Sequence, residues 1–475
     1  MEASVNVTSL DIYHRKASKS VYGFFEIYLA ITLYLILILG KILLLEWANN
    51  SFISSAIWKW LLWMNIFEAI GWIVWIIIRH GTRLGPVLLL LPLACFFYTN
   101  VPIFMLSNSL DIYPFPNNAI FYGMWLQSAM STHLWLFVAF MSSKSRDVYI
   151  VKRINSWLND IPSTRFGKQT FFLLGIIFAA FNLANFYISG AADLVGNVSR
   201  AESYGAANAG DLWILNYIFV AWSMTLILIW NSTQTRLMFT KVQHVFAIIA
   251  ILIFLYPTLR LGSRREIILI LLFYFIILCL KGRAIIAYSF AATLFIPMAY
   301  LGLIRGSVNL ESMDVLTVYI RLFGEFVNPH FPLLYYITRG SPLWLGWSYV
   351  RAIGIIIPTL HVITKPQILA ALFAQMYANG SMGYAYTPLG EGYANFGSIS
   401  ILVVPMYLIG LERILTRIKH FFPVPLLVFL ATAMDINRGE FATIISETII
   451  FSFTIYLLLA ILKINPPRLM PRTEK

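Results

Sequence analysis

The sequence predicts an all-α, polytopic membrane protein with about twelve transmembrane helices and one large extracytoplasmic loop. Of its 475 residues, 59% are hydrophobic and only 12% are charged, whereas soluble domains carry about 25% charged residues. Apolar runs recur along the chain, and many approach the roughly 20 residues that a helix needs to cross a bilayer. Lys and Arg gather in alternate connections, which sets the orientation. We therefore expect a single integral membrane domain, residues 1–475.

The apolar runs give the expected spans. The first run is too long for the apolar segment of a cleavable signal peptide, so we expect it to remain as a helix. The predicted spans are Tyr22–Trp47, Phe52–Ile78, Leu84–Leu106, Ala119–Met141, Gln169–Ile188, Asp211–Trp230, Val242–Thr258, Glu266–Leu280, Ala284–Ile304, Phe396–Leu411, Phe422–Met434 and Phe441–Leu462.

Basic residues orient these spans. With the N-terminus inside, 22 of the 34 Lys and Arg residues fall in cytoplasmic segments, which places both termini in the cytoplasm. The same bias explains the net charge of +13 without a nucleic-acid partner. Ten basic residues fall outside, and all except Lys365 are arginine. Arginine's planar fork binds phosphate and carboxylate groups bidentately, so this excess predicts an anion site at the outer face.

The connection between spans nine and ten, residues 305–395, is much longer than the others, and long connections are usually functional or structured. Ser312–Phe326 has the pattern of an amphipathic helix, and Leu343–Ile357 and Pro366–Tyr377 are further expected helices. Arg305, Arg321 and Arg339 lie in this loop beside Tyr and Trp residues, where they are candidate sugar ligands. An interfacial aromatic belt is the alternative explanation for the aromatic residues.

Arg260, Arg264 and Arg265 lie within six positions between two spans. If the seventh span continues as a helix, Arg260 and Arg264 share one face. We expect the three guanidinium groups to bind a diphosphate at the membrane surface. The alternative is that the side chains extend to lipid headgroups.

Two other outer segments carry candidate groups. Glu391, flanked by glycines just before span ten, is placed to deprotonate a hydroxyl or to fix an arginine; the alternative is a helix-start signal, since acids favour helix N-termini. The short turn 435–440 contains Arg438 and Glu440, which either close the same cavity or form a weak surface ion network.

Within the spans, ionisable residues are unusual and suggest function. Lys41 and Lys59 lie near span ends, so extension to the interface or pairing with Glu46 accounts for them. Glu68 has no evident partner in the sequence. Both cysteines fall in apolar runs, and no Cys/His spacing predicts a metal site. The sequence lacks the glycine-rich loop motif that binds nucleotide phosphates, so it does not predict a nucleotide-driven pump.

Three features resemble the Wzy-type O-antigen and capsule polymerases, also called oligosaccharide repeat-unit polymerases. One is Gly262-Ser-Arg264-Arg265-Glu266 opening a middle span. Another is the large outer loop before the last three spans. The third is Pro388-Leu-Gly-Glu391-Gly-Tyr393-Ala-Asn395-Phe-Gly397, which enters a span ending in Leu408-Ile-Gly410.

The resemblance implies an inner-membrane glycosyltransferase of the lipid-donor, GT-C-like architecture. It would join undecaprenyl-pyrophosphate-linked oligosaccharide units at the periplasmic face, with inversion, without a metal and without a cofactor. Arg264 and Arg265 would hold the donor diphosphate, and Glu391 would be the base or position the acceptor. Membrane lipid and a chain-length regulator protein are further expected partners. The remaining substrate-binding candidates are Arg260, Arg305, Arg321, Arg339, Tyr393, Asn395, Arg438 and Glu440.

Two alternatives stay open. A ligase would move finished glycan onto a lipid core by related chemistry. A flippase or transporter of lipid-linked oligosaccharide would instead line a pore with its arginines. The gathering of arginine on one face favours the enzyme.

Overall fold

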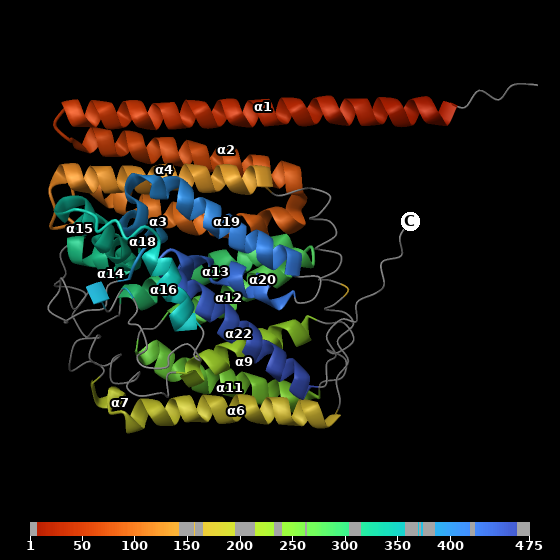
Figure 1. Ribbon diagram of the computed structural model, residues 1–475. Helices are drawn as coiled ribbons and strands as arrows, with labels where there is room; N and C mark the ends of the chain where they lie inside the picture. The colour runs from red at the N-terminus through yellow and green to blue at the C-terminus, as the bar shows by residue number, and fades with distance from the viewer. Residues whose placement is uncertain are drawn as a thin grey trace, which may run out of the picture.

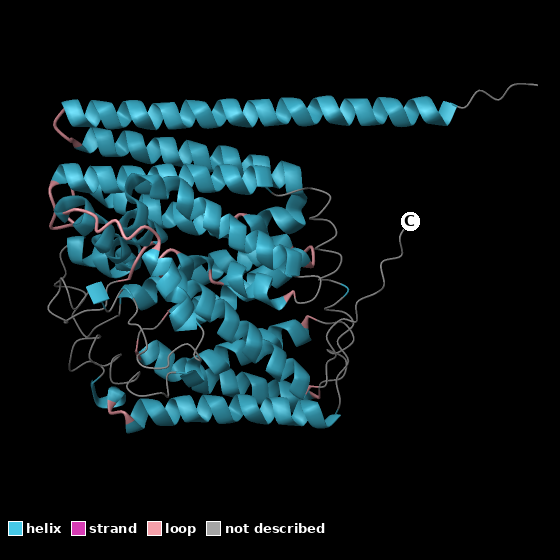
Figure 2. Cartoon of the chain, viewed as in Figure 1, coloured by secondary structure: helices cyan, strands magenta, loops and turns pink. Residues whose placement is uncertain are grey.

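The computed structural model describes residues 7–141, 156, 165–194, 214–231, 240–261, 264–303, 315–356, 369, 372–373, 385–418 and 423–462. In these residues the chain forms helices and turns and no strand (Figures 1 and 2). The principal helices are α1 (Val7–Asn50), α2 (Ser55–Leu88), α3 (Leu90–Ser107), α4 (Asn117–Met141), α6 (Arg165–Ile188), α9 (Ile214–Trp230), α11 (Lys241–Arg260), α12 (Arg265–Leu280), α13 (Ala284–Leu303), α14 (Val315–Val327), α15 (Phe331–Arg339), α16 (Trp347–Ile356), α18 (Pro388–Phe396), α19 (Ser400–Ile418), α20 (Val424–Ala431), α21 (Ala433–Ile436) and α22 (Phe441–Ile461).

The protein is a multi-pass membrane protein. Seven segments of the described chain are long and apolar enough to cross a membrane, namely Tyr28–Asn50, Ser55–Gly81, Leu90–Ser107, Gly167–Ile188, Lys241–Arg260, Pro388–Arg417 and Phe441–Ile461. The long helices lie side by side, and the start of α1 and the end of α22 are at the same end of the bundle (Figure 1). An even number of crossings would place them there. The full set of twelve spans stays a prediction.

Helix α4 covers the predicted span Ala119–Met141 but is not among these seven segments. The reason is its polar content, since Gln127, Ser128, Thr132 and His133 interrupt its apolar sequence. All four side chains are buried in the protein. A span that faces neighbouring helices can carry polar groups that lipid would not accept.

Close helix packing depends on glycine at several positions, of which Gly175 and Gly123 are examples. A Cβ atom added at Gly175 on α6 would lie 2.2 Å from the Trp222 ring, which is fully buried on α9. One added at Gly123 on α4 would lie 2.6 Å from Leu334 of α15. These glycines let the helix backbones approach large side chains directly.

The connection after α13 contains short helices, two of which match predicted ones, and Figure 1 shows the short helices gathered at one end of the bundle, here called the site end. Helix α14 matches the expected Ser312–Phe326, and α16 lies within the expected Leu343–Ile357. The α14 residue Phe326 packs edge-on against Tyr98 of α3, with ring centroids 5.0 Å apart. The expected helix Pro366–Tyr377 lies outside the described residues except at positions 369, 372 and 373.

Candidate functional site

The centre of the candidate site is Arg265, the first residue of α12. Its guanidinium forms an ion pair with Asp435 of α21 at 3.1 Å and a second with Glu447 of α22. It also donates a hydrogen bond of 2.9 Å to the hydroxyl of Tyr217 on α9. Burial alone would lower the pKa of Arg265, but the carboxylate of Asp435 raises it above its usual value. Arg265 therefore joins three other helices while keeping its charge.

Arg264 and Arg438 reach the same region through Glu325 of α14. Arg438, in the turn before α22, lies 2.5 Å from one Glu325 oxygen, and Arg264 lies 3.8 Å from the other. Burial lowers the pKa of Arg264, whereas at Arg438 the charges of Glu325, Tyr98 and Asp435 together outweigh burial and raise the pKa. One carboxylate is thus shared by two arginines.

These six residues form the arginine–carboxylate cluster: Arg264, Arg265 and Arg438 with Glu325, Asp435 and Glu447. Three guanidinium groups face three carboxylates, so the formal charges of the cluster balance. Arg264, Arg265 and Arg438 would repel one another without anions between them. Here the protein's own acids offset that charge, and a diphosphate would have to compete with those acids.

Glu391 lies in the first turn of α18 and is only 1% exposed. One carboxylate oxygen accepts a hydrogen bond from the Ser348 hydroxyl at 2.7 Å, and the other accepts from the Phe441 backbone N–H at 2.6 Å. Thr387 caps the start of α18 by accepting from the Gly390 N–H. The helix-start interpretation therefore fits the position, and the same carboxylate also ties α16 and α22 to α18.

The turn 433–441 connects Glu391 with the arginine–carboxylate cluster. Asp435 and Arg438 contact the cluster, and the Phe441 N–H contacts Glu391. The predicted ligands Arg438 and Glu440 thus lie on a segment that touches both groups. The proposed shared site of Arg264, Arg265 and Glu391 has a direct structural link in this turn.

Glu440 is buried at the start of α22, where one of its carboxylate oxygens accepts a hydrogen bond of 2.7 Å from the Leu369 N–H. Burial raises the pKa of its carboxyl to about 8, although this hydrogen bond favours the charged form. Between about pH 4.5 and 8, the folded protein therefore holds a proton that the unfolded chain releases. The free energy of unfolding should fall as the pH rises through this window.

We expect Glu440→Gln to remove that contribution, because glutamine does not titrate. In detergent, the unfolding temperature of the wild type should drop more steeply than that of Glu440→Gln between about pH 5 and 8. Glu46→Gln, a change at an exposed carboxyl, is the matched control and should keep the wild-type slope. Parallel curves for the wild type and Glu440→Gln would contradict this assignment.

Asn395 and Tyr393 have packing roles in the structure. The Asn395 side-chain amide donates to the Ser348 hydroxyl at 2.7 Å and to the Glu391 carbonyl at 2.8 Å, and its oxygen accepts from the Gly346 N–H. It therefore fixes the Ser348 hydroxyl that donates to Glu391. Tyr393 is half-buried and packs against a cluster that includes Tyr336 and Tyr386.

The other predicted ligands do not join the cluster. The condition for Arg260 and Arg264 to share one helix face is not met, because α11 ends at Arg260 and α12 begins only at Arg265. Arg260 is exposed, and so is Arg339 at the end of α15. Arg321 lies on α14, but its side chain is outside the described part of the structure, as is the whole of Arg305.

Four partners were not predicted as site residues: Glu325, Asp435, Glu447 and Ser348. Glu325 has the i, i+4 spacing of a local helix pair with Arg321, but in the structure it binds Arg264 and Arg438. Glu447 carries a usable signal, since an acid in the middle of an apolar span needs a partner. Nothing in the sequence distinguishes Ser348 from other serines.

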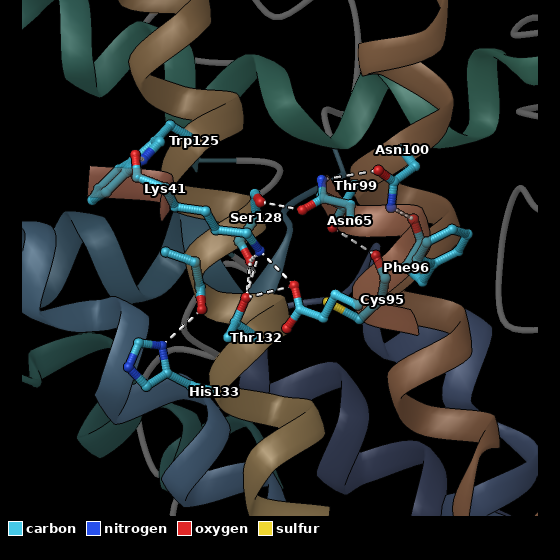
Figure 3. Close-up of polar contacts among 12 residues, drawn as sticks. Lys41, Asn65, Cys95, Phe96, Thr99, Asn100, Trp125, Ser128, Thr132 and His133 are labelled. Carbon is cyan, nitrogen blue, oxygen red and sulfur yellow. Dashed lines mark hydrogen bonds and ion pairs between the residues drawn. The ribbon is translucent and has the colours of Figure 1, made fainter. Parts of the chain in front are cut away.

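A second set of polar side chains lies between helices α1, α2, α3 and α4 (Figure 3). Lys41 is fully buried and forms an ion pair of 2.6 Å with Glu68 of α2. It also donates to the Thr132 hydroxyl and to the Ser128 carbonyl on α4. The prediction that Lys41 extends to the interface or pairs with Glu46 is therefore wrong, and Glu68 has its partner.

This Lys41–Glu68 pair continues into a chain of neutral polar groups. Ser128 donates to Asn65, and Asn65 donates to Asn100 of α3. On the other side, the Trp125 indole donates to the Lys41 carbonyl at 2.7 Å. These contacts connect all four N-terminal helices, and they hold α1, most of whose apolar surface is exposed, to the bundle.

Comparisons with known protein families, with curated proteins and with solved structures give no match for this chain. Its function is therefore argued from its own residues.

Proposed function

We propose that this protein polymerises oligosaccharide repeat units carried on undecaprenyl pyrophosphate, at the periplasmic face of the bacterial inner membrane. The observation that supports the proposal best is the meeting of Arg264, Arg265 and Arg438 at the site end, where the segment 433–441 connects them to the buried carboxyl of Glu391. Fixed guanidinium groups stabilise the negative charge that develops on a diphosphate as it leaves.

In the proposed reaction, a hydroxyl of the acceptor glycan attacks the anomeric carbon of the donor. The bond between that carbon and the diphosphate oxygen breaks, and its electron pair leaves with the diphosphate. The hydroxyl proton passes to a carboxylate, for which Glu391 is the candidate. A single displacement inverts the configuration at the anomeric carbon.

The arginine–carboxylate cluster suggests how the resting site keeps its charges. Without substrate, Glu325 binds Arg264 and Arg438 in the place that a diphosphate would take. An incoming diphosphate would replace this single carboxylate with several oxygens that accept bidentate hydrogen bonds. Arg265 has two carboxylates and a tyrosine as partners, so we assign it the more permanent position.

A deletion strain tests the proposal. Cells without this protein should lose the ladder of long glycan chains on a gel and retain glycolipid with a single repeat unit. The wild-type gene and the control Lys59→Met, which changes an exposed residue, should both restore the ladder.

Other outcomes of the deletion would contradict polymerisation. Long polymer that stays on its carrier lipid would indicate a ligase. Lipid-linked single units trapped in the cytoplasmic leaflet would indicate a flippase. A normal ladder in the deletion strain would remove a role in chain growth altogether.

A further inference from the structure

A cavity of about 660 Å³ lies at the end of the bundle opposite the arginine–carboxylate cluster. Helix α12 runs between the two places, since it begins at Arg265 and is followed by Lys281, which lines the cavity. The ends of α9, α11, α12 and α13 surround this space. Its volume falls within the range of small-molecule sites, roughly 300–1,000 Å³.

The walls of the cavity are mostly aromatic and aliphatic. Trp230 stacks on His244, with ring centroids 5.8 Å apart, and Tyr274 meets Phe290 edge-on at 5.2 Å. Ile270 and Leu271 complete one side. On α13, the neighbouring Ile285 and Ile286 are 83% and 55% exposed, so the apolar lining adjoins an apolar outer surface. A hydrocarbon chain fits such a lining.

Two cations stand at the mouth of the cavity. Lys281 and Arg283 belong to the turn between α12 and α13, and both line the space. In the described part of the chain, no carboxylate lies within ion-pair distance of either. Burial lowers the pKa of Lys281, and the nearby charge of Arg283 lowers it further. An anion between the two would relieve this repulsion.

We propose that this cavity binds an anionic phospholipid, with its phosphate between Lys281 and Arg283 and one acyl chain along Leu271 and Phe290. Basic residues in such a turn also orient a membrane protein. Orientation, however, does not require an apolar cavity directly beneath them. Basic pockets between transmembrane helices are known sites for anionic lipid headgroups. This inference is independent of the proposed glycosyl transfer.

The test is a lipid titration of the full-length protein in detergent, followed by native mass spectrometry. Phosphatidylglycerol should bind with a saturable affinity that Lys281→Gln/Arg283→Gln weakens about tenfold or more, because each lost cation removes about 1 kcal/mol of attraction. The conservative pair Lys281→Arg/Arg283→Lys should retain binding. An unchanged unfolding temperature would show that the double glutamine variant still folds. If that variant does not fold, the conservative pair decides: loss of phosphatidylglycerol binding in the folded conservative variant would overturn the proposal.

The matched control is Lys241→Gln/Arg417→Gln, which removes two exposed charges that do not line the cavity. It should change the affinity less than about twofold. An equal loss in both double variants would overturn the proposal in favour of general surface attraction. Binding of phosphatidylcholine with the same affinity as phosphatidylglycerol would also overturn the proposal. Displacement of phosphatidylglycerol by inorganic phosphate would overturn it in favour of a site for free anions.

Discussion

Arg265→Gln is expected to destabilise the protein by about 3 kcal/mol, near the lower end of the range for breaking a buried ion pair. The change leaves Asp435 and Glu447 without their cation, and both are more than nine-tenths buried. We choose the lower end of the range because the Arg265 side chain is still 26% exposed in the folded protein. The unfolding temperature in detergent measures the effect.

A control and a rescue separate charge from packing. Arg260→Gln removes an exposed arginine from the end of the preceding helix α11 and should leave the unfolding temperature nearly unchanged. The triple variant Arg265→Gln/Asp435→Asn/Glu447→Gln removes all three charges and should recover much of the lost stability. If Arg265→Gln and Arg260→Gln were equally stable, the buried ion pairs would not have the weight assigned to them.

Arg264→Lys and Arg265→Lys separate stability from function. Lysine keeps the positive charge but lacks the planar fork that binds two phosphate oxygens. Each variant should therefore remain folded and yet make far fewer long glycan chains than the wild type. Normal chain length at normal protein levels would show that the forks do not act on the donor.

The second large effect is expected in the membrane interior, at the pair of Lys41 and Glu68. Lys41→Met leaves Glu68 buried without a cation, and Glu68→Met leaves the Lys41 charge unmatched. Each single change should cost about 3–5 kcal/mol of stability. The double variant Lys41→Met/Glu68→Met should lie much closer to the wild type, since no buried charge remains.

A double-mutant cycle of unfolding measurements tests this coupling. Lys59→Met is the matched control, because the sequence gives both lysines the same span-end position but only Lys59 is exposed in the structure. It should have little effect. Additive losses from Lys41→Met and Glu68→Met would show that the two side chains do not stabilise each other.

The sequence predicts the helices well because apolar length and basic loops are local properties. From the sequence, the turn 435–440 either closes a cavity shared with Arg264 and Arg265 or forms a surface ion network, and the structure brings Asp435 into contact with Arg265. The sequence cannot predict which carboxylate each arginine binds. Glu325 is four residues from Arg321 in the chain. Its ion pairs with Arg264 and Arg438 form only because α14 packs against the bundle.

The same limit applies to the lysines and to the helix break. Lys41 and Glu68 are 27 positions apart, and their contact depends on how α1 and α2 pack against α4. Arg260 and Arg264 have the spacing of one helix face, but α11 ends between them. Periodicity describes a helix only while the helix continues.

The most direct test of the central claim is chain extension by the purified protein. It uses purified undecaprenyl-pyrophosphate-linked repeat units, no other protein and a metal chelator. We expect the wild type to produce a ladder of longer lipid-linked glycans with release of undecaprenyl pyrophosphate, and Arg265→Lys to produce little of it. Folded wild-type protein that leaves the single units unchanged would contradict the account.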